Sequence, residues 1–440
     1  MPSGPILIFD KSSLESLNLD EAVLLDNFYL SNITPLFFVE CLADLEKAIR
    51  SRSTPEQLVG SLADRTPEAQ SCPSVHHMSI LDFELQGKFD MKKVHFRPMM
   101  AGGRPTRLGG EKGVVFQQSP EAEALQRWTK REFLDLERQI AKQWRQALSG
   151  INFSDMITIV RSGTGPWRKP KDLKDAKYLA DTIIDHLDQE WLLRFGLALL
   201  GIPQATETVI AHWREQRRPP LREHLPYFIF LLTINIFFCL VLPTELLRNV
   251  KSSHQIDLAY LYYLPFCTVF TSKDRFHAQT VPLFLDPFQT FVHGDDLKKE
   301  LQRLDVHYST LSEDERKEGL ITFASTPPAD NTFLTTQLWD KYLPGWRAIK
   351  AEPKPERDPQ ADKELLEKLK QRAEAPTTHE EHEIDTLDYL TIHRNVRLRK
   401  GKYQRFSEAQ EQRMRENDLI RKNTTGEHTS IDEHWNQTES

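Results

Sequence analysis

The stretch from Gln255 to Leu285 constrains the fold most, because it places two carboxylates on two adjoining elements. Its first part has helical spacing, with Asp257 on the same face as several apolar residues. Residues 268–271 (TVFT) are short, apolar and β-branched, which predicts a buried strand. Asp274 lies just past the C-terminal end of that strand, where ligands bind in open α/β sheets. We therefore expect Asp257 and Asp274 to share a cleft.

The N-terminus repeats this arrangement. Residues 5–9 (PILIF) predict a second buried strand, Asp10 follows its C-terminal end, and Ser12 comes two residues later. Residues 33–47 (ITPLFFVECLADLEK) predict a helix that begins with a Thr-Pro pair and carries Glu40 among apolar side chains. A carboxylate in apolar surroundings needs a partner, and a metal ion is one such partner.

Taken in order, these features resemble the PIN-domain nucleases, a family that includes the toxin ribonucleases of bacterial toxin–antitoxin pairs. The shared pattern is a strand followed by Asp-x-Ser, a Thr-Pro helix with Glu, a helical Asp, and a strand followed by Thr-x-x-Asp. The resemblance covers roughly the first 50 residues and residues 252 to about 303. About 200 residues separate Glu40 from Asp257, whereas PIN domains are usually compact.

The resemblance implies catalytic and metal-binding roles for four carboxylates: Asp10, Glu40, Asp257 and Asp274. Ser12 would orient Asp10. Ligands that are all oxygen atoms select Mg²⁺ or Mn²⁺, and two such ions about 4 Å apart can drive phosphodiester cleavage. We expect a nucleic-acid substrate, with RNA favoured over DNA. A silent PIN-like scaffold that binds RNA or a protein partner, a structural subunit that binds through its tail, and a homodimer remain open alternatives.

The composition limits how nucleic acid could bind. The chain has 440 residues and a formal net charge of −7, so a contact must come from a local basic patch. None of the 4 Cys residues has metal-site or redox spacing, and no basic region precedes an apolar run at the N-terminus. These features predict a cytoplasmic protein with reduced cysteines and about two or three structural units.

The middle of the chain contains a glycine-rich stretch at residues 101–114 (AGGRPTRLGGEKGV) with Arg104, Arg107 and Lys112. Such a stretch can wrap a phosphate backbone, although it is not a Walker A loop, because no Gly-Lys-Ser/Thr follows. The favoured interpretation is a mobile exposed loop. Residues 80–89 alternate as a strand does, and helical patterns follow from residue 119. Residues 227–242 are apolar but shorter than a membrane span, which predicts a buried helix and no membrane partner.

The C-terminal part is charged. Residues 391–405 (TIHRNVRLRKGKYQR) form the most basic run, which is either a nucleic-acid contact or an arm that docks on the acidic body; its candidate contacts are Arg397, Arg399 and Lys400. We expect an α/β fold with a mainly parallel sheet flanked by helices. The parts are a PIN-like core at residues 1–50 and 226–311, a mostly helical insertion at 51–225, and a partly disordered extension at 312–440.

Overall fold

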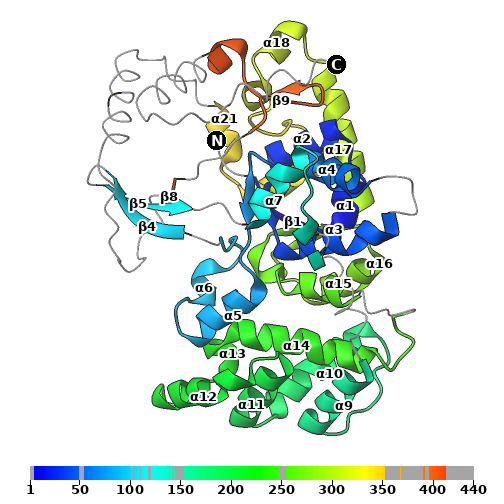
Figure 1. Cartoon of the computed structure of the whole chain (residues 1–440), viewed down its shortest axis with the longest axis vertical. Helices are drawn as coiled ribbons and strands as arrows, with labels where there is room; N and C mark the ends of the chain where they lie inside the picture. Colours follow the sequence, from blue (N-terminus) through cyan, green and yellow to red (C-terminus); the bar gives the residue numbers. More distant parts are fainter. Residues whose placement is uncertain are drawn as a thin grey trace.

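The structure is a computed structural model of the whole chain (Figure 1). It describes residues 4–48, 54–100, 103–108, 111–116, most of 120–143, 153–247, 254–351, 390–391 and 396–412, besides the isolated Glu367. The part of residues 413–440 that was expected to be disordered lies outside the described residues.

A five-stranded parallel sheet forms the centre, in the order β3-β2-β1-β6-β7. Its strands are β1 (Ile6–Phe9), β2 (Leu30–Ile33), β3 (Ser71–Pro73), β6 (Val269–Ser272) and β7 (Thr290–His293). The strands expected at residues 5–9 and 268–271 are therefore confirmed, and they are neighbours, with Leu7 opposite Val269 and Phe9 opposite Thr271. Strand β3 and helix α4 (Pro55–Arg65) come from the segment that was assigned to the insertion.

The sheet separates two hydrophobic cores, because successive side chains of a strand point to opposite faces. Ile8 and Phe270 pack into one core, whereas Leu7, Phe9 and Val269 pack into the other. The first core contains helices α5 (His77–Leu85), α14 (Pro226–Val241) and α15 (His254–Leu261). The second contains α2 (Leu19–Phe28), α17 (Gly294–Ser309) and α20 (Leu334–Tyr342). Both faces of the central strands are thus covered, as all-parallel sheets require.

Helix α14 confirms the buried helix predicted at residues 227–242. All of its residues from Tyr227 to Val241 except Phe230 are buried. It is surrounded by a helical lobe, which Figure 1 shows below the sheet: α9 (Phe153–Thr164), α10 (Leu173–His186), α11 (Gln189–Leu199), α12 (Thr206–Glu215) and α13 (Leu221–His224). No described helix is both long enough and apolar enough to cross a membrane.

The strand-like pattern at residues 80–89 was misleading, because residues 77–85 form α5. Glu84 explains the difference. Its buried carboxylate accepts hydrogen bonds from the backbone N–H groups of Tyr227 (2.8 Å) and Phe228 (2.7 Å), at the start of α14. A polar residue at this buried position made the helix look like an alternating strand. Burial raises the pKa of Glu84 to about 7, although the two backbone hydrogen bonds oppose that shift.

The chain beyond residue 312 contributes to the second core before it leaves the described region. Helices α18 (Glu313–Lys317), α19 (Leu320–Phe323), α20 and α21 (Trp346–Ala351) follow α17. Trp339 and Trp346 are buried, and the indole N–H of Trp339 donates to the backbone oxygen of Phe28 (2.9 Å). A short hairpin, β9 (Arg399–Lys400) and β10 (Tyr403–Gln404), docks later. Strands β4 (Gly103–Leu108), β5 (Glu111–Phe116) and β8 (Leu390–Thr391) form a separate small sheet.

The capping of α14 by Glu84 gives a first prediction. Glu84→Ala leaves two buried N–H groups without acceptors at the start of the central helix, and we expect it to lower the free energy of unfolding by about 3 kcal/mol. Asp82→Ala on the exposed side of the same helix is the control and should cost less than about 1 kcal/mol. Urea unfolding measures both, and equal losses would show that the contact does not stabilise α14.

Candidate functional site

The carboxylates predicted from the sequence gather where the strand order of the sheet reverses. Strands β1, β2 and β3 follow one another on one side, and β6 and β7 lie on the other, so the reversal falls between β1 and β6. Asp10 directly follows β1, and Asp274 lies two residues after β6. In open parallel sheets, the crevice outside the carboxyl ends at such a reversal is the usual place for a ligand.

Asp10 is buried and held by several donors. Its Oδ1 accepts from the backbone N–H of Ser13 (2.9 Å), which makes it the N-cap of α1 (Lys11–Glu15). Its Oδ2 accepts from the hydroxyls of Ser12 (2.7 Å) and Ser272 (2.6 Å). Ser272 stands at the end of β6, so its hydroxyl joins the two central strands at the base of the site.

His277 on α16 (Arg275–Thr280) is the cation beside Asp10. It is fully buried, with Nδ1 3.6 Å from Oδ2 of Asp10. Its Nε2 lies 2.8 Å from the backbone oxygen of Asp257, which only accepts, and its Nδ1 lies 2.8 Å from the Ser272 hydroxyl. Because that hydroxyl gives its one proton to Asp10, both ring nitrogens must donate, and the ring carries a positive charge.

The titration of this pair agrees with that geometry. Burial alone lowers the pKa of His277, but its interaction with the nearby carboxylate of Asp10 outweighs burial and raises the pKa to about 9. Burial conversely raises the pKa of Asp10, and the interactions with His277, Ser272 and Ser12 outweigh it, so that the pKa lies below its ordinary value. Asp10 and His277 thus form a buried ion pair.

Glu40 approaches the same place from α3 (Pro35–Ala48). Its Oε2 accepts from the hydroxyl of Tyr260 (2.9 Å) and from the backbone N–H of Lys11 (3.2 Å). The side chain is half-buried. Burial, followed by the negative charges of Asp10 and Asp257, raises the pKa of Glu40 to about 8. The charge of Lys11 and the hydrogen bond from Tyr260 oppose this shift without cancelling it, so Glu40 is mostly protonated at neutral pH.

Asp257 and Asp274 complete the group, and both are half-buried. Burial raises the pKa of Asp257 to about 6; the charge of His277 opposes the shift, and the charges of Asp274 and Asp10 add to it. Asp274 caps α16, since its Oδ1 accepts from the backbone N–H of Phe276 (2.5 Å). At this edge of the sheet the charges of Asp10 and Asp257 thus act on Glu40, and the charges of Asp10 and Asp274 act on Asp257.

The donor set suits a hard divalent cation, because it consists of carboxylate and hydroxyl oxygens. In the described residues, however, no group of three or more His, Cys, Asp or Glu side chains is arranged to hold a metal ion. The structure therefore gathers the predicted acids without bringing them to coordinating distance of one point.

The basic residues predicted to contact nucleic acid have different positions. Arg104 and Arg107 lie on β4 and Lys112 on β5, with Arg107 directly opposite Lys112 in the antiparallel register. The stretch that was expected to be a loop is thus a β-hairpin, which Figure 1 shows at the side of the molecule, apart from the parallel sheet. The side chains of this hairpin lie outside the described residues.

The basic run near the C-terminus is largely engaged with the body of the protein. Arg397 forms ion pairs with Asp64 (3.0 Å) and Glu68, and the buried Lys400 donates to the backbone oxygen of Thr66 (3.0 Å). These contacts favour the docking arm over a nucleic-acid contact for Arg397 and Lys400. Arg399 alone among the three points to solvent.

Three site residues were not predicted from the sequence: Ser272, His277 and Tyr260. Ser272 directly follows the strand predicted at residues 268–271, and Tyr260 lies among the apolar residues of the helix that carries Asp257. His277 had one signal, a lone histidine in the short segment after the second strand-end Asp, but its partner Asp10 is 267 positions earlier in the chain.

Comparison with protein-family models, with curated proteins and with solved structures gives no match. The likeness to PIN-domain nucleases therefore depends on the residues and their placement.

The raised pKa of Glu40 gives a second prediction. A group whose pKa is higher in the folded protein weakens folding as pH rises, here between its ordinary value of 4.5 and about 8. Glu40→Gln should therefore leave stability nearly unchanged at pH 4.5 and raise the free energy of unfolding at pH 9 by at least about 1.4 kcal/mol, one pKa unit. Urea unfolding in EDTA measures both. Glu223→Gln, at an exposed position, should show no such pH dependence.

Asp10 should behave in the opposite way, because it neutralises a buried cation. Asp10→Asn leaves His277 without its anion, and we expect a loss of about 3 kcal/mol at pH 7. The same unfolding measurement tests this prediction. A gain in stability with Asp10→Asn would contradict the charged state assigned to His277.

Proposed function

We propose that this chain is a PIN-like, metal-dependent phosphodiesterase that cleaves RNA in preference to DNA. The support is the placement of acids at the sheet reversal together with the order of motifs that resembles the PIN-domain nucleases. Asp10, Glu40, Asp257 and Asp274 would hold Mg²⁺ or Mn²⁺. When bound, such ions would supply an activated water and stabilise the leaving oxygen of the phosphodiester.

The observation that carries this proposal is how the carboxylates are anchored. Glu40 uses Oε2 for its two hydrogen bonds and Asp274 uses Oδ1, so that each has a second oxygen without a hydrogen-bond partner among the described residues. Anchoring by one oxygen fixes the carboxylate while leaving the other available to a ligand. Glu84, whose carboxylate connects two helices, instead uses both of its oxygens.

The charge balance points in the same direction. His277 offsets Asp10, but the pKa values of Glu40 and Asp257 are raised to about 8 and about 6 by burial and mutual repulsion. Carboxylates held close together repel one another when they are ionised, and a bound cation relieves that repulsion. The residues of the chain would bind and orient the ions, while the Asp10–His277 pair keeps β1 and β6 aligned beneath them.

A second candidate function is a silent scaffold that binds RNA or a protein partner. The specific observation that favours it is that His277 already neutralises Asp10, the acid with the most central position. A scaffold of this kind would keep the fold and the ion pair but would not cleave.

Cleavage of labelled single-stranded RNA by the purified chain, with and without EDTA, tests the proposal. Asp274→Asn is the sharpest variant, because asparagine still caps α16 while one ligand charge is lost. We expect a fall of at least about 100-fold in rate. Asp296→Asn, at an exposed ion pair on α17, is the control and should retain full activity.

Binding of Mg²⁺ or Mn²⁺ should also release protons, because Glu40 must ionise to become a ligand. Calorimetry at pH 7 in buffers of different ionisation enthalpy should show release of about one proton, which Glu40→Gln abolishes. Undiminished cleavage by Asp274→Asn would assign the activity to another site or to a contaminant. The absence of metal binding would favour the scaffold.

A further inference from the structure

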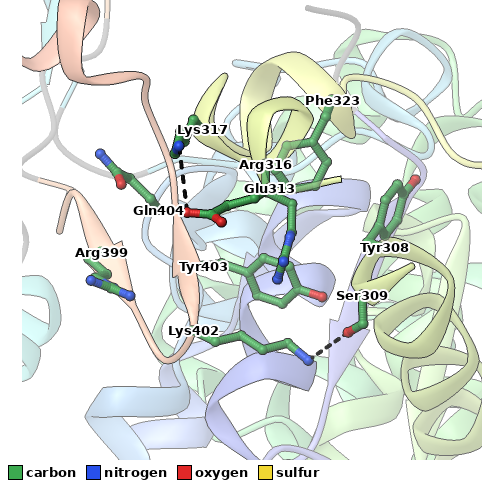
Figure 2. Close-up of a pocket in the computed structure, with 10 residues that line it drawn as sticks. All are labelled: Tyr308, Ser309, Glu313, Arg316, Lys317, Phe323, Arg399, Lys402, Tyr403 and Gln404. Atoms are coloured by element: carbon green, nitrogen blue, oxygen red, sulfur yellow. Dashed lines mark hydrogen bonds and ion pairs between the residues drawn. The ribbon is translucent and has the colours of Figure 1, made fainter. Parts of the chain in front are cut away.

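A second site lies outside the carboxylate cluster, where the hairpin β9–β10 meets three helices. A cavity of about 330 Å³ opens between α17, α18 and α19 on one side and the hairpin β9–β10 on the other (Figure 2). Its walls carry four cationic side chains, namely Arg316, Lys317, Arg399 and Lys402, and one carboxylate, Glu313. Three acids contact the two lysines, so the positive charge that remains comes from the two arginines, although the chain as a whole has a net charge of −7.

Two of these cations are already paired. Lys402 contacts Asp305 (2.8 Å) and Ser309 (3.0 Å), and Lys317 lies 3.5 Å from Glu313. Arg316 and Arg399 are exposed, and neither side chain has a hydrogen bond or ion pair with any residue that the structure describes. Two guanidinium groups thus remain available for an anion.

The base of the cavity is rigid and aromatic. Tyr308 and Tyr403 are buried, and the hydroxyl of Tyr403 donates to Asp305 (2.7 Å). Phe323 is half-buried on the wall. Figure 2 shows Arg316 extending from α18 toward Tyr403. Because Tyr308 and Tyr403 are buried, only the half-buried Phe323 offers aromatic surface to a ligand, and the arginines are the main groups that could bind one.

The two free arginines lie on different faces of the hairpin. In its antiparallel register Arg399 pairs with Gln404 and Lys400 pairs with Tyr403, so Arg399 projects away from the Tyr403 side. Figure 2 shows Arg399 beside Gln404, with the strand between them and Arg316. Because the strand lies between them, a single phosphate group cannot contact both guanidinium groups, whereas a polymer that carries several phosphates can contact each one.

We propose that this cavity and the adjoining face of the hairpin hold the phosphate backbone of a single-stranded nucleic acid. Arg316 and Arg399 each contact one phosphate, for which the planar guanidinium is well shaped. The site lies outside the carboxylate cluster. It rests on the proposed function only for the choice of nucleic acid over another phosphorylated polymer, and its binding needs no metal and no cleavage.

The hairpin can serve as one wall because it is firmly docked. The guanidinium of Arg405 is buried and donates to the carboxylate of Asp26 (2.7 Å), and Lys400 reaches Thr66. At the turn, Gly401 has a φ of 58° and lies against Asp20, which accepts from the backbone N–H of Lys402 (2.8 Å). The cavity is therefore preorganised, which lowers the entropic cost of binding.

Fluorescence anisotropy with a labelled 12-nucleotide single-stranded RNA, in EDTA, tests the proposal on the full chain. We expect the double variant Arg316→Gln/Arg399→Gln to bind about tenfold more weakly at 100 mM salt. The slope of log affinity against log salt should also become shallower by about 1.4, which corresponds to two lost phosphate contacts on a single strand. Arg217→Gln/Arg218→Gln removes the same charge from two exposed arginines on the helical lobe and should change neither value.

Unchanged affinity of the first double variant would overturn the proposal, and so would an equal loss in the control. Competition by a polyglutamate peptide as strong as that by polyuridine would also overturn it, because it would show a general acidic-peptide surface. The two proposals fail separately. Intact binding without cleavage by the wild-type chain contradicts the nuclease alone, whereas intact cleavage with unchanged binding by the variant contradicts this site alone.

Discussion

The pairing of β1 with β6 is the contact on which the rest of the structure depends. The backbone N–H of Thr268 donates to Ile6 (2.9 Å), and the N–H of Asp10 donates to Thr271 (3.4 Å), across more than 260 positions of sequence. This single junction brings the strand-end acids together, creates the reversal of strand order, and divides the two cores. Because closing so long a loop costs entropy, the contacts made by the residues between the two strands must offset that cost.

The parts of the fold that could be predicted from the sequence are those that local chemistry determines. Residues 5–9 and 268–271 form short apolar runs, and α14 is apolar on all sides. The spacing and the length of these apolar runs were therefore enough to predict two strands and a buried helix. Strand β2 (LSNI) was missed because its polar residues satisfy tertiary contacts: the Asn32 amide donates to the backbone oxygen of Phe266 (3.1 Å). Strand β3 has three residues, too few for a pattern.

In the candidate site, too, the sequence predicted some residues and missed others. The strand-end rule located Asp10 and Asp274, and helical spacing located Glu40 and Asp257, because each is set by its own element. The buried cation could not be found in this manner. His277 acquires its role from Asp10, a residue far away in sequence, through the hydroxyl of Ser272 at the end of β6. A sequence pattern reports which groups are present, whereas their charge states depend on partners that only the fold provides.

The C-terminal segment shows how the same residue type is divided between structure and binding. In the run from 397 to 405, Arg397 and Arg405 face carboxylates of α2, α4 and the loop after α4, so their charges are consumed by docking. Arg399 lies between them in sequence but on the opposite face of the hairpin from Lys400, where no described acid reaches it. Period-two alternation thus separates Arg399 from Lys400, which helps to hold the arm, whereas Arg397 lies before the strand and is paired with Asp64 and Glu68. The cationic side chains of a basic strand should therefore be counted separately for each face of the strand. When one face packs on the protein, only the cations of the other face are free to contact a partner.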